Sequence, residues 1–231
     1  MSYHKKAMVG AGDHDTAVRL APGVHPPLRS LSFLAVALVS CSLWGCGGSR
    51  RVAFDLPWAT SQAGSNDHSL LYAADSQHDV LVVIDARTGV TRSQVKVGPV
   101  PASIAVGADD SIYVANRGGR SVSVIRRGEW KEVARIPTGV EPAALALSRD
   151  GRLLYVLNNS SLEDPEMGTL MAVDLQTQKL TWMLAIGRDP REIRVLEGHR
   201  ARVRLHRDRT TVEVDLDAPR ILRREVLLTL R

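Results

Sequence analysis

The sequence predicts an all-β fold of about four stacked, four-stranded antiparallel sheets, and three recurring motifs support this prediction. A strand motif that begins with tyrosine occurs at intervals of 41 and 42 residues, at Tyr72, Tyr113 and Tyr155. A second motif, two small or aliphatic residues and then usually a charged one, occurs at residues 83–85, 124–126 and 172–174, with a shorter copy at 214–215. The third motif, Gly-x-x-Pro, begins at Gly98, Gly139 and Gly187. Three motifs that keep one register indicate a repeated structural unit.

Each repeat is predicted to contain four short strands. One strand follows the Gly-x-x-Pro turn, one begins at the tyrosine, one contains the second motif, and one precedes the next glycine, as in residues 181–186. Turn-forming pairs lie between them, at Thr88-Gly89, Asp109-Asp110 and Asp150-Gly151. Four antiparallel strands in roughly 40 to 45 residues is the size of a β-propeller blade.

The amino-terminal part, residues 1–45, is predicted to be a disordered leader and a secretory signal. Arg29 provides the basic flank, residues 31–39 form a short apolar run, and Leu43-Trp44-Gly45-Cys46 follows. Leu43, Gly45 and Cys46 resemble a bacterial lipobox, in which the signal is cleaved before a cysteine that receives lipid. An uncleaved membrane anchor is the alternative, but the apolar core is short for a membrane span.

The lipobox resemblance implies that Cys46 is the lipid attachment site and that Leu43 and Gly45 belong to the cleavage signal. Lipid on Cys46 would tether the protein to a membrane without crossing it. Residue 47 is glycine and not aspartate, which in the enterobacterial sorting pattern implies the outer membrane. Residues 46–66 are then a lipidated tether, in which residues 61–65 have the composition of a loop, and residues 67–231 are the repeat domain.

The fourth repeat is predicted to be an exposed end of the stack. In its strands charged residues alternate strictly with aliphatic ones, as in residues 192–195, 202–205 and 211–215. The sheet therefore has one solvent-exposed and one buried face. The prediction is therefore an open or partial stack of four blades. A closed ring is the alternative, but it would bury the charges of Arg202, Arg204 and Glu213.

At the other end of the stack, the apolar face of the first blade needs a cover. Val52, Phe54 and Leu56 alternate with other residues and are predicted to supply that cover as a strand, with a partner chain as the alternative.

The motifs Tyr-Val-x-Asn, Val-x-Val-Ile and Gly-x-x-Pro, which stand at Tyr113, Val122 and Gly139, resemble the YVTN family of β-propeller repeats. The resemblance is clear over residues 70–190 and weaker over 191–230, where Val203 takes the tyrosine position and His206 the asparagine position. It implies that the tyrosine packs and that the asparagine closes an Asx-turn. Family rings usually have about seven blades, so four imply a partial ring or a remnant of a longer propeller.

Charge and cysteine content exclude several classes of function. The chain has a net charge of +5, and after residue 45 the basic excess lies in residues 188–231, which hold 12 basic and 8 acidic residues, whereas residues 46–187 hold 14 and 15. Aromatic residues for base stacking are absent from that basic region, so we expect no nucleic-acid partner. Cys41 lies within the signal, so the mature domain has no disulfide, thiolate metal ligand or cysteine nucleophile.

No catalytic or cofactor-binding motif occurs in the repeat domain. We therefore expect no catalytic residue, no metal and no cofactor. An insertion before the third Gly-x-x-Pro motif contains Glu163, Asp164 and Glu166, and it is the candidate rim binding loop. It could bind a partner or calcium, and a solvated acidic loop is the simpler interpretation.

These observations favour a membrane-anchored envelope lipoprotein whose repeats form a non-enzymatic platform for a protein or glycan. The alternative, implied by propeller lactonases and dehydrogenase chains, is an enzyme or redox accessory subunit. A cluster of at least three carboxylate, asparagine or histidine side chains at one rim would favour this alternative.

Overall fold

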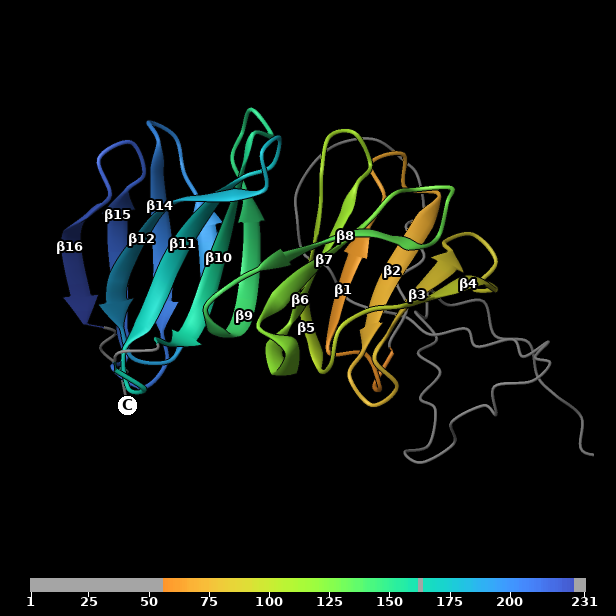
Figure 1. The fold of residues 1–231 in the computed structure, drawn as a ribbon, viewed down its shortest axis with the longest axis horizontal. Helices are drawn as coiled ribbons and strands as arrows, with labels where there is room; N and C mark the ends of the chain where they lie inside the picture. The colour runs from red at the N-terminus through yellow and green to blue at the C-terminus, as the bar shows by residue number, and fades with distance from the viewer. Residues whose placement is uncertain (1–55, 162–163, 227–231) are drawn as a thin grey trace, which may run out of the picture.

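The computed structural model describes residues 56–161 and 164–226, and these residues form an all-β structure. Four separate sheets follow one another along the chain, each with four antiparallel strands (Figure 1). The strands of the first two sheets are β1 (Ser61–Gly64), β2 (Leu70–Asp75), β3 (Val80–Asp85), β4 (Thr91–Lys96), β5 (Pro101–Val106), β6 (Ile112–Asn116), β7 (Ser121–Ile125) and β8 (Glu132–Pro137). Those of the last two are β9 (Val140–Leu147), β10 (Leu153–Ser160), β11 (Gly168–Asp174), β12 (Lys179–Gly187), β13 (Pro190–Val195), β14 (Arg200–Leu205), β15 (Thr210–Asp215) and β16 (Arg220–Val226).

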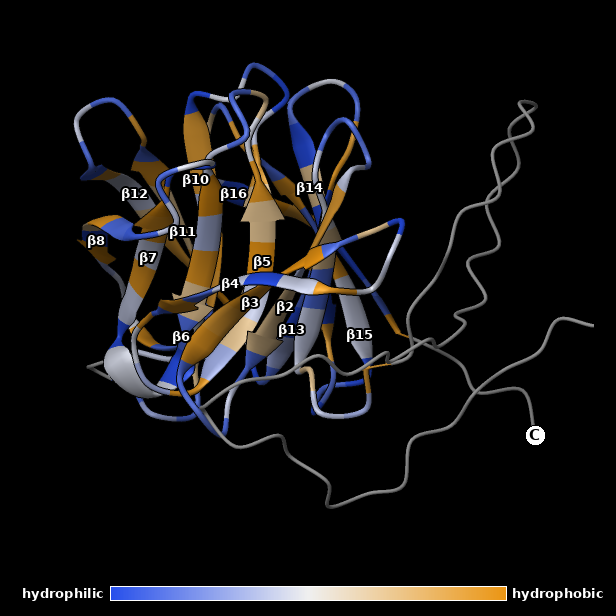
Figure 2. Ribbon diagram, turned by 90° about the vertical axis from the view of Figure 1, so that its right-hand side faces the viewer, coloured by the Kyte–Doolittle hydropathy of each residue, from blue (hydrophilic) through white to orange (hydrophobic). Residues whose placement is uncertain are grey.

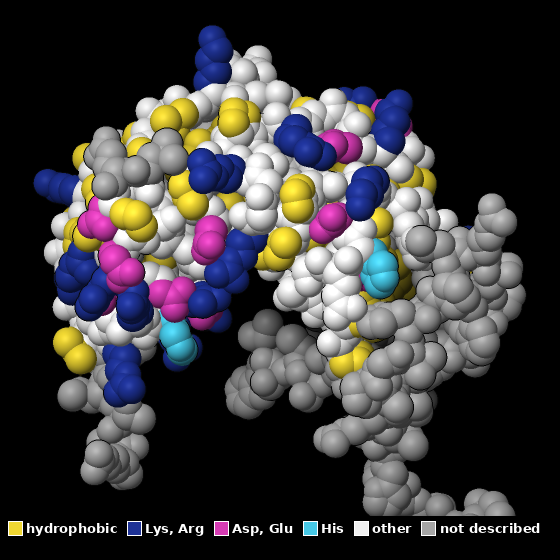
Figure 3. Space-filling view, turned by 60° about the horizontal axis from the view of Figure 1, so that its bottom comes forward, with side chains coloured by type: hydrophobic (Ala, Val, Ile, Leu, Met, Phe, Trp, Pro, Cys, Tyr) yellow, Lys and Arg dark blue, Asp and Glu magenta, His cyan; other side chains and the backbone are white. Residues whose placement is uncertain are grey.

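Each sheet is a simple meander, because its strands pair in the order in which they occur in the sequence. The first strands of the four sheets, β1, β5, β9 and β13, lie next to one another, so the sheets stack like blades around a common axis. The first and fourth blades lie at opposite ends of the molecule (Figure 1). In Figure 3 the described residues form an arch around a hollow. The predicted open stack of four blades is therefore confirmed.

Apolar side chains from facing blades form the core, in three clusters between successive blades. Tyr72, Tyr113 and Tyr155 each lie on the face that their blade turns toward the next one. Tyr155, for example, belongs to the cluster that contains Val203 and Leu205 of the fourth blade. The strands are therefore mostly hydrophobic and the connecting loops mostly hydrophilic (Figure 2). Each fully buried valine or leucine contributes about 1.5–3 kcal/mol, so these interfaces hold the blades together.

Two of the repeated motifs are packing partners. A Cβ atom on Gly98 would lie 2.6 Å from Cγ of Asn116, and one on Gly139 would lie 2.9 Å from Cγ of Asn158. Only glycine leaves room for the asparagine at this point. The Asn116 Nδ2 group donates a hydrogen bond of 2.8 Å to Ser123 Oγ, so the asparagine is held inside the blade.

The predicted Asx-turn is wrong for these two asparagines. Their amide groups donate to side-chain hydroxyls, those of Ser121 and Ser123 for Asn116 and that of Thr169 for Asn158. At the same position of the first blade stands Asp75, and its carboxylate does accept hydrogen bonds from the backbone N–H groups of Gln77 and His78. The turn thus forms where the residue is an aspartate, and the two asparagines pack instead.

The predicted alignment of the fourth blade was wrong by one residue. Pro190 pairs with Leu205, just as Pro101 pairs with Asn116 and Pro142 with Asn158. Leu205, not His206, therefore occupies the asparagine position, and Arg202, not Val203, occupies the tyrosine position. The alignment to the repeat changes by one residue, whereas the predicted exposed face of Arg202 and Arg204 is confirmed.

The first blade begins earlier than the composition suggested. Residues 61–65, predicted to be a loop, contain strand β1 (Ser61–Gly64), which pairs with β2. Leu56 packs on the outer face of this blade against Ala73, Val82 and Ile84 and is only 6% exposed. Trp58 packs beside it, whereas Val52 and Phe54 lie outside the described residues. The chain that precedes β1 thus covers one end of the stack.

The opposite end of the stack is charged and exposed. Arg194, Arg202 and Arg204 of the fourth blade point away from the third blade and are exposed. Glu213 on the same face is buried, but Arg200 and Arg223 pair with its carboxylate. No helix among the described residues is long and apolar enough to cross a membrane.

Candidate functional site

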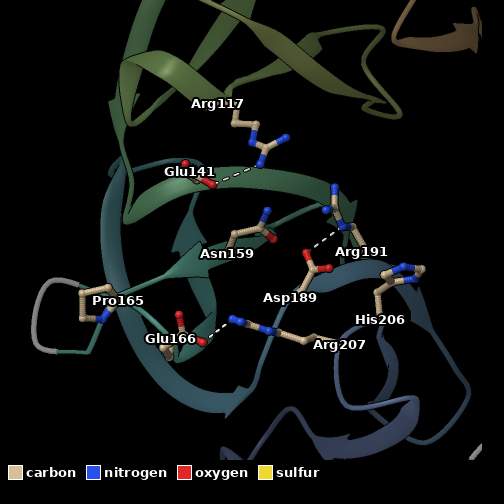
Figure 4. A pocket seen from close by; sticks show the side chains of 9 residues that line it. All are labelled: Arg117, Glu141, Asn159, Pro165, Glu166, Asp189, Arg191, His206 and Arg207. Carbon is tan, nitrogen blue, oxygen red and sulfur yellow. Dashed lines mark hydrogen bonds and ion pairs between the residues drawn. The ribbon is translucent and has the colours of Figure 1, made fainter.

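The candidate site is a pocket of about 380 Å³ at one rim of the arch, where the Gly-x-x-Pro turns connect the strands. Loops and strand ends of the second, third and fourth blades surround it (Figure 4). Its lining consists of Arg117, Glu141, Asn159, Pro165, Glu166, Asp189, Arg191, His206 and Arg207. Acidic and basic side chains also gather beside the hollow on the limb of the arch formed by the carboxyl-terminal blades (Figure 3). The pocket is therefore polar and open to solvent.

Residues at two equivalent positions of the repeat line this pocket. The third residue of the Gly-x-x-Pro turn provides Glu141 and Asp189, which have left-handed backbones with φ of 54° and 53°. Val100, at the same position of the preceding turn, has φ of 53°, so this strained conformation belongs to the turn itself. The second such position directly follows the asparagine of the repeat, and it is occupied by Arg117, Asn159 and His206.

Oppositely charged side chains are paired around the pocket. Arg117 donates to Glu141 over 3.1 Å and Arg191 to Asp189 over 2.7 Å, while Arg207 donates to Glu166 (Figure 4). The Arg117–Glu141 and Arg207–Glu166 pairs each connect one blade to the next. Among the described residues, the three arginines and three carboxylates of the lining contribute no net charge when His206 is neutral. Exposed pairs of this kind contribute at most about 1 kcal/mol each, so their main effect is on what the pocket can bind.

Asn159 is the lining residue with an unsatisfied polar atom. Its Oδ1 atom is buried and accepts no hydrogen bond from any described residue. Figure 4 shows its side chain among Glu141, Asp189 and Arg191. A buried carbonyl oxygen without a partner is costly, so a ligand with an N–H or O–H donor would gain by reaching it.

A further ion pair supports the turn that carries Asp189. The backbone N–H of Arg188 donates to Asp208 Oδ2 over 2.9 Å, and its guanidinium Nε donates to Asp208 Oδ1 over 2.7 Å. The backbone hydrogen bond from Arg188 is the largest cause that lowers the pKa of Asp208; burial opposes it and the guanidinium adds to it. The His206 backbone N–H donates to the carbonyl oxygen of Asp189 over 2.9 Å, which ties the two loops together.

The acidic residues of the predicted rim loop differ in their positions. Glu166 lines the pocket. Asp164 does not, because its carboxylate accepts a hydrogen bond of 2.9 Å from the Glu166 backbone N–H and its carbonyl oxygen accepts one from Ser161. Glu163 lies outside the described residues, as do Leu43, Gly45 and Cys46 of the predicted lipidation signal.

The sequence analysis missed Arg117, Asn159, Arg191 and Arg207. The signal for Arg117 and Asn159 was available in the sequence, because each directly follows the asparagine of the repeat. Within residues 56–161 and 164–226, no three histidine, aspartate or glutamate side chains are grouped so that they could hold a metal ion. His206, Asp189 and Glu166 line one pocket without forming such a group.

No protein-family model matches this sequence, and no curated protein matches it. Solved structures do resemble the fold. A chain of hydrazine synthase from Kuenenia stuttgartiensis has a TM-score of 0.68 and 23% identity over 79% of this chain and 53% of that one. A functionally unknown protein from Desulfotomaculum acetoxidans has a TM-score of 0.59 and 17% identity over 74% and 58%.

A third similar structure is the dihydro-haem d1 dehydrogenase NirN, with a TM-score of 0.57 and 17% identity over 71% of this chain and 36% of that one. The present chain thus spans at most 58% of these three proteins. At such low identities the likeness concerns the fold alone. Together with the four stacked sheets, it shows that the chain has a β-propeller fold.

Proposed function

We propose that this chain is a lipid-anchored protein of the bacterial cell envelope that binds a partner in its rim pocket without reacting with it. The lipobox resemblance of Leu43, Gly45 and Cys46 supports the envelope address, most simply the outer membrane. The Tyr-Val-x-Asn and Gly-x-x-Pro motifs support the assignment of the blades to YVTN-type repeats. The pocket at the meeting point of three blades supports a role in binding.

The pairing of charges in the pocket is the observation on which the binding role rests. Arg117, Arg191 and Arg207 each form an ion pair with a carboxylate. The described arginines of the pocket are therefore already neutralised and do not favour a strongly charged ligand. The pocket offers hydrogen-bond donors, acceptors and the unsatisfied oxygen of Asn159. A protein segment fits this chemistry, because its backbone alternates N–H donors and C=O acceptors with no net charge. Among the described residues, no phenylalanine, tyrosine or tryptophan lines the pocket for stacking on a sugar, which favours a protein over a glycan.

The anchoring is tested by metabolic labelling with a radioactive fatty acid. The full chain should incorporate the label and fractionate with membranes, and Cys46→Ser should lose both properties. A Cys46→Ser protein that keeps its label and its membrane association would refute the anchor.

The binding role is tested by placing a photoreactive amino acid at Glu166 in the full chain, expressed in its own cells. Illumination should give one discrete protein adduct, and Arg117→Glu, which reverses a charge across the pocket, should abolish it. The same photoreactive residue at Arg87, in the exposed β3–β4 turn of the first blade, is the control. An adduct sensitive to glycosidase would identify a glycan partner instead, and the absence of any adduct would refute the proposal.

The second candidate is an accessory subunit of a redox enzyme. It is favoured by His206, which lies in one pocket with Asp189 and Glu166, and by the fold shared with hydrazine synthase and NirN. Titration of the full chain with haem or a divalent metal distinguishes the two candidates. The binding role predicts no absorption band that depends on His206, whereas a band lost in His206→Ala would favour the redox role.

A further inference from the structure

A second hollow, of about 250 Å³, lies on the outer face of the fourth blade, away from the third blade. Glu192, Arg194, Arg202, Arg204 and Thr211 line it, and all five belong to β13, β14 and β15. It shares no residue with the rim pocket. In the earlier blades the corresponding face is covered by the next blade, so this hollow exists only where the stack ends.

Two arginines in this hollow form no ion pair with any residue that the structure describes. Arg202 is paired across the sheet with Glu213, but the Glu213 carboxylate is already bound by Arg223 Nε at 2.9 Å and by Arg200 at 3.2 Å. Arg204 lies opposite Thr211 on one side and Glu192 on the other, and it forms no ion pair with any residue that the structure describes. Both guanidinium groups therefore keep their hydrogen-bond donors available.

The register also places two like charges side by side. Arg194 and Arg202 are direct cross-strand partners, an arrangement that destabilises an isolated sheet. The Arg194–Glu192 pair, at 3.7 Å between two exposed side chains, offsets this repulsion only weakly. An anion placed between the two guanidinium groups would replace the repulsion by attraction.

We propose that Arg194, Arg202 and Arg204 form a binding site for a phosphate group. Three arginines and one glutamate give the hollow a net charge of +2, which matches the −1.5 to −2 of a phosphate monoester at neutral pH. A phosphate has three terminal oxygens, and guanidinium groups bind such oxygens with paired N–H donors. The Thr211 hydroxyl adds a further donor at the edge of the hollow.

The comparison with the other blades shows that these charges are not part of the repeat. The position of Arg202 is taken by Tyr72, Tyr113 and Tyr155 in the first three blades, and that of its partner Glu213 by valine or alanine. A solvated end needs polar side chains, but it does not need three arginines around one hollow. The phosphate can come from a soluble phosphomonoester or from a lipid headgroup, and both present the same group to the site.

Binding is measured by thermal unfolding of the full chain in detergent, with inorganic phosphate and with chloride at matched ionic strength. A ligand that binds the native state raises Tm. Because phosphate also stabilises proteins non-specifically, the test is the difference between variants. Arg202→Gln/Arg204→Gln should weaken the apparent affinity for phosphate by about tenfold or more, because it removes the charge-assisted hydrogen bonds of two guanidinium groups.

Two control variants and one vesicle assay complete the test. Arg87→Gln/Arg149→Gln removes the same charge elsewhere and should leave the phosphate effect intact. Arg202→Lys/Arg204→Lys keeps the charge without the guanidinium geometry and should restore only part of it. Cosedimentation with phosphatidic acid vesicles, against phosphatidylcholine vesicles, distinguishes a lipid headgroup from a soluble source. Equal phosphate effects in the wild type, the glutamine variant and the control would overturn the proposal.

Discussion

Neighbouring residues of strand β14 lie on opposite faces of the fourth blade and have opposite surroundings. Val203 is fully buried between the third and fourth blades, whereas its neighbour Arg202 is exposed on the outer face. In the three earlier blades the position of Arg202 is a buried tyrosine. The repeat thus keeps its apolar face toward the preceding blade and changes the other face to arginine and glutamate where no blade follows. The outer face of the fourth blade is therefore one that favours water.

Placing a charged residue at position 203 and an apolar residue at position 202 should produce the largest difference in stability. Val203→Arg would place an unpaired charge in the core between blades and should lower the free energy of unfolding by more than about 4 kcal/mol. Arg202→Leu should change it by less than about 0.5 kcal/mol, although the new apolar patch should promote aggregation. Urea denaturation of the two variants measures both values. Severe destabilisation by Arg202→Leu in a monomer would show that the outer face is buried.

The packing of Gly98 against Asn116 predicts the next effect. Gly98→Ala would place a methyl group 2.6 Å from the Asn116 side chain and should cost roughly 1–3 kcal/mol through overpacking. Removing the obstacle in Gly98→Ala/Asn116→Ala should recover part of this loss. A double-mutant cycle by chemical denaturation measures the coupling. Additive losses would mean that the two motifs do not pack against each other.

The charged end predicts a dependence of stability on pH. The hydrogen bond from Arg223 lowers the pKa of Glu213 below its ordinary value of 4.5; burial opposes it, and Arg200 adds to it. A carboxyl group whose pKa is lower in the folded state stabilises the protein above the unfolded pKa and loses this contribution as the pH falls. Glu213→Gln should therefore have the lower Tm at pH 7, and the difference should shrink below about pH 4.5. A difference that grows with acidification would contradict the pairing.

The smallest effect is expected at the rim pocket. Arg207→Ala removes an exposed partner of Glu166, and such pairs contribute about 1 kcal/mol or less. Its Tm should stay close to that of the wild type, and a large fall would show that this loop is part of the core. Reduced crosslinking at Glu166 together with an unchanged Tm would place the role of Arg207 in binding and not in folding.

The spacing of the repeats predicted the number of blades and the four strands in each, and the alternating charges of the last repeat predicted the open end. The details that it missed depend on strand pairing. An alternating strand such as residues 200–205 can be aligned to the repeat in two registers. Arg202, and not Val203, could therefore be assigned to the tyrosine position only once Pro190 was paired with Leu205. Strand β1 was missed because Ser61 to Gly64 has a loop-like composition and forms a strand through its pairing with β2.

The candidate site was predicted in part. Glu166 was found because the insertion interrupts the spacing of the repeats. Its partner Arg207 was not found, because the two residues lie 41 positions apart and only the stacking of the blades brings them together. The residues after the asparagine position, by contrast, could have been identified, because each directly follows a position that the repeat marks.

The reactivity of single cysteines on β14 tests the open end most directly. In a full chain with Cys41→Ser and Cys46→Ser, maleimide should label Arg202→Cys and Arg204→Cys at nearly the rate of the unfolded protein. Val203→Cys should be protected until the protein unfolds. Protection of the first two cysteines in the native monomer would show that the outer face of the fourth blade is covered, and it would contradict the open stack of four blades.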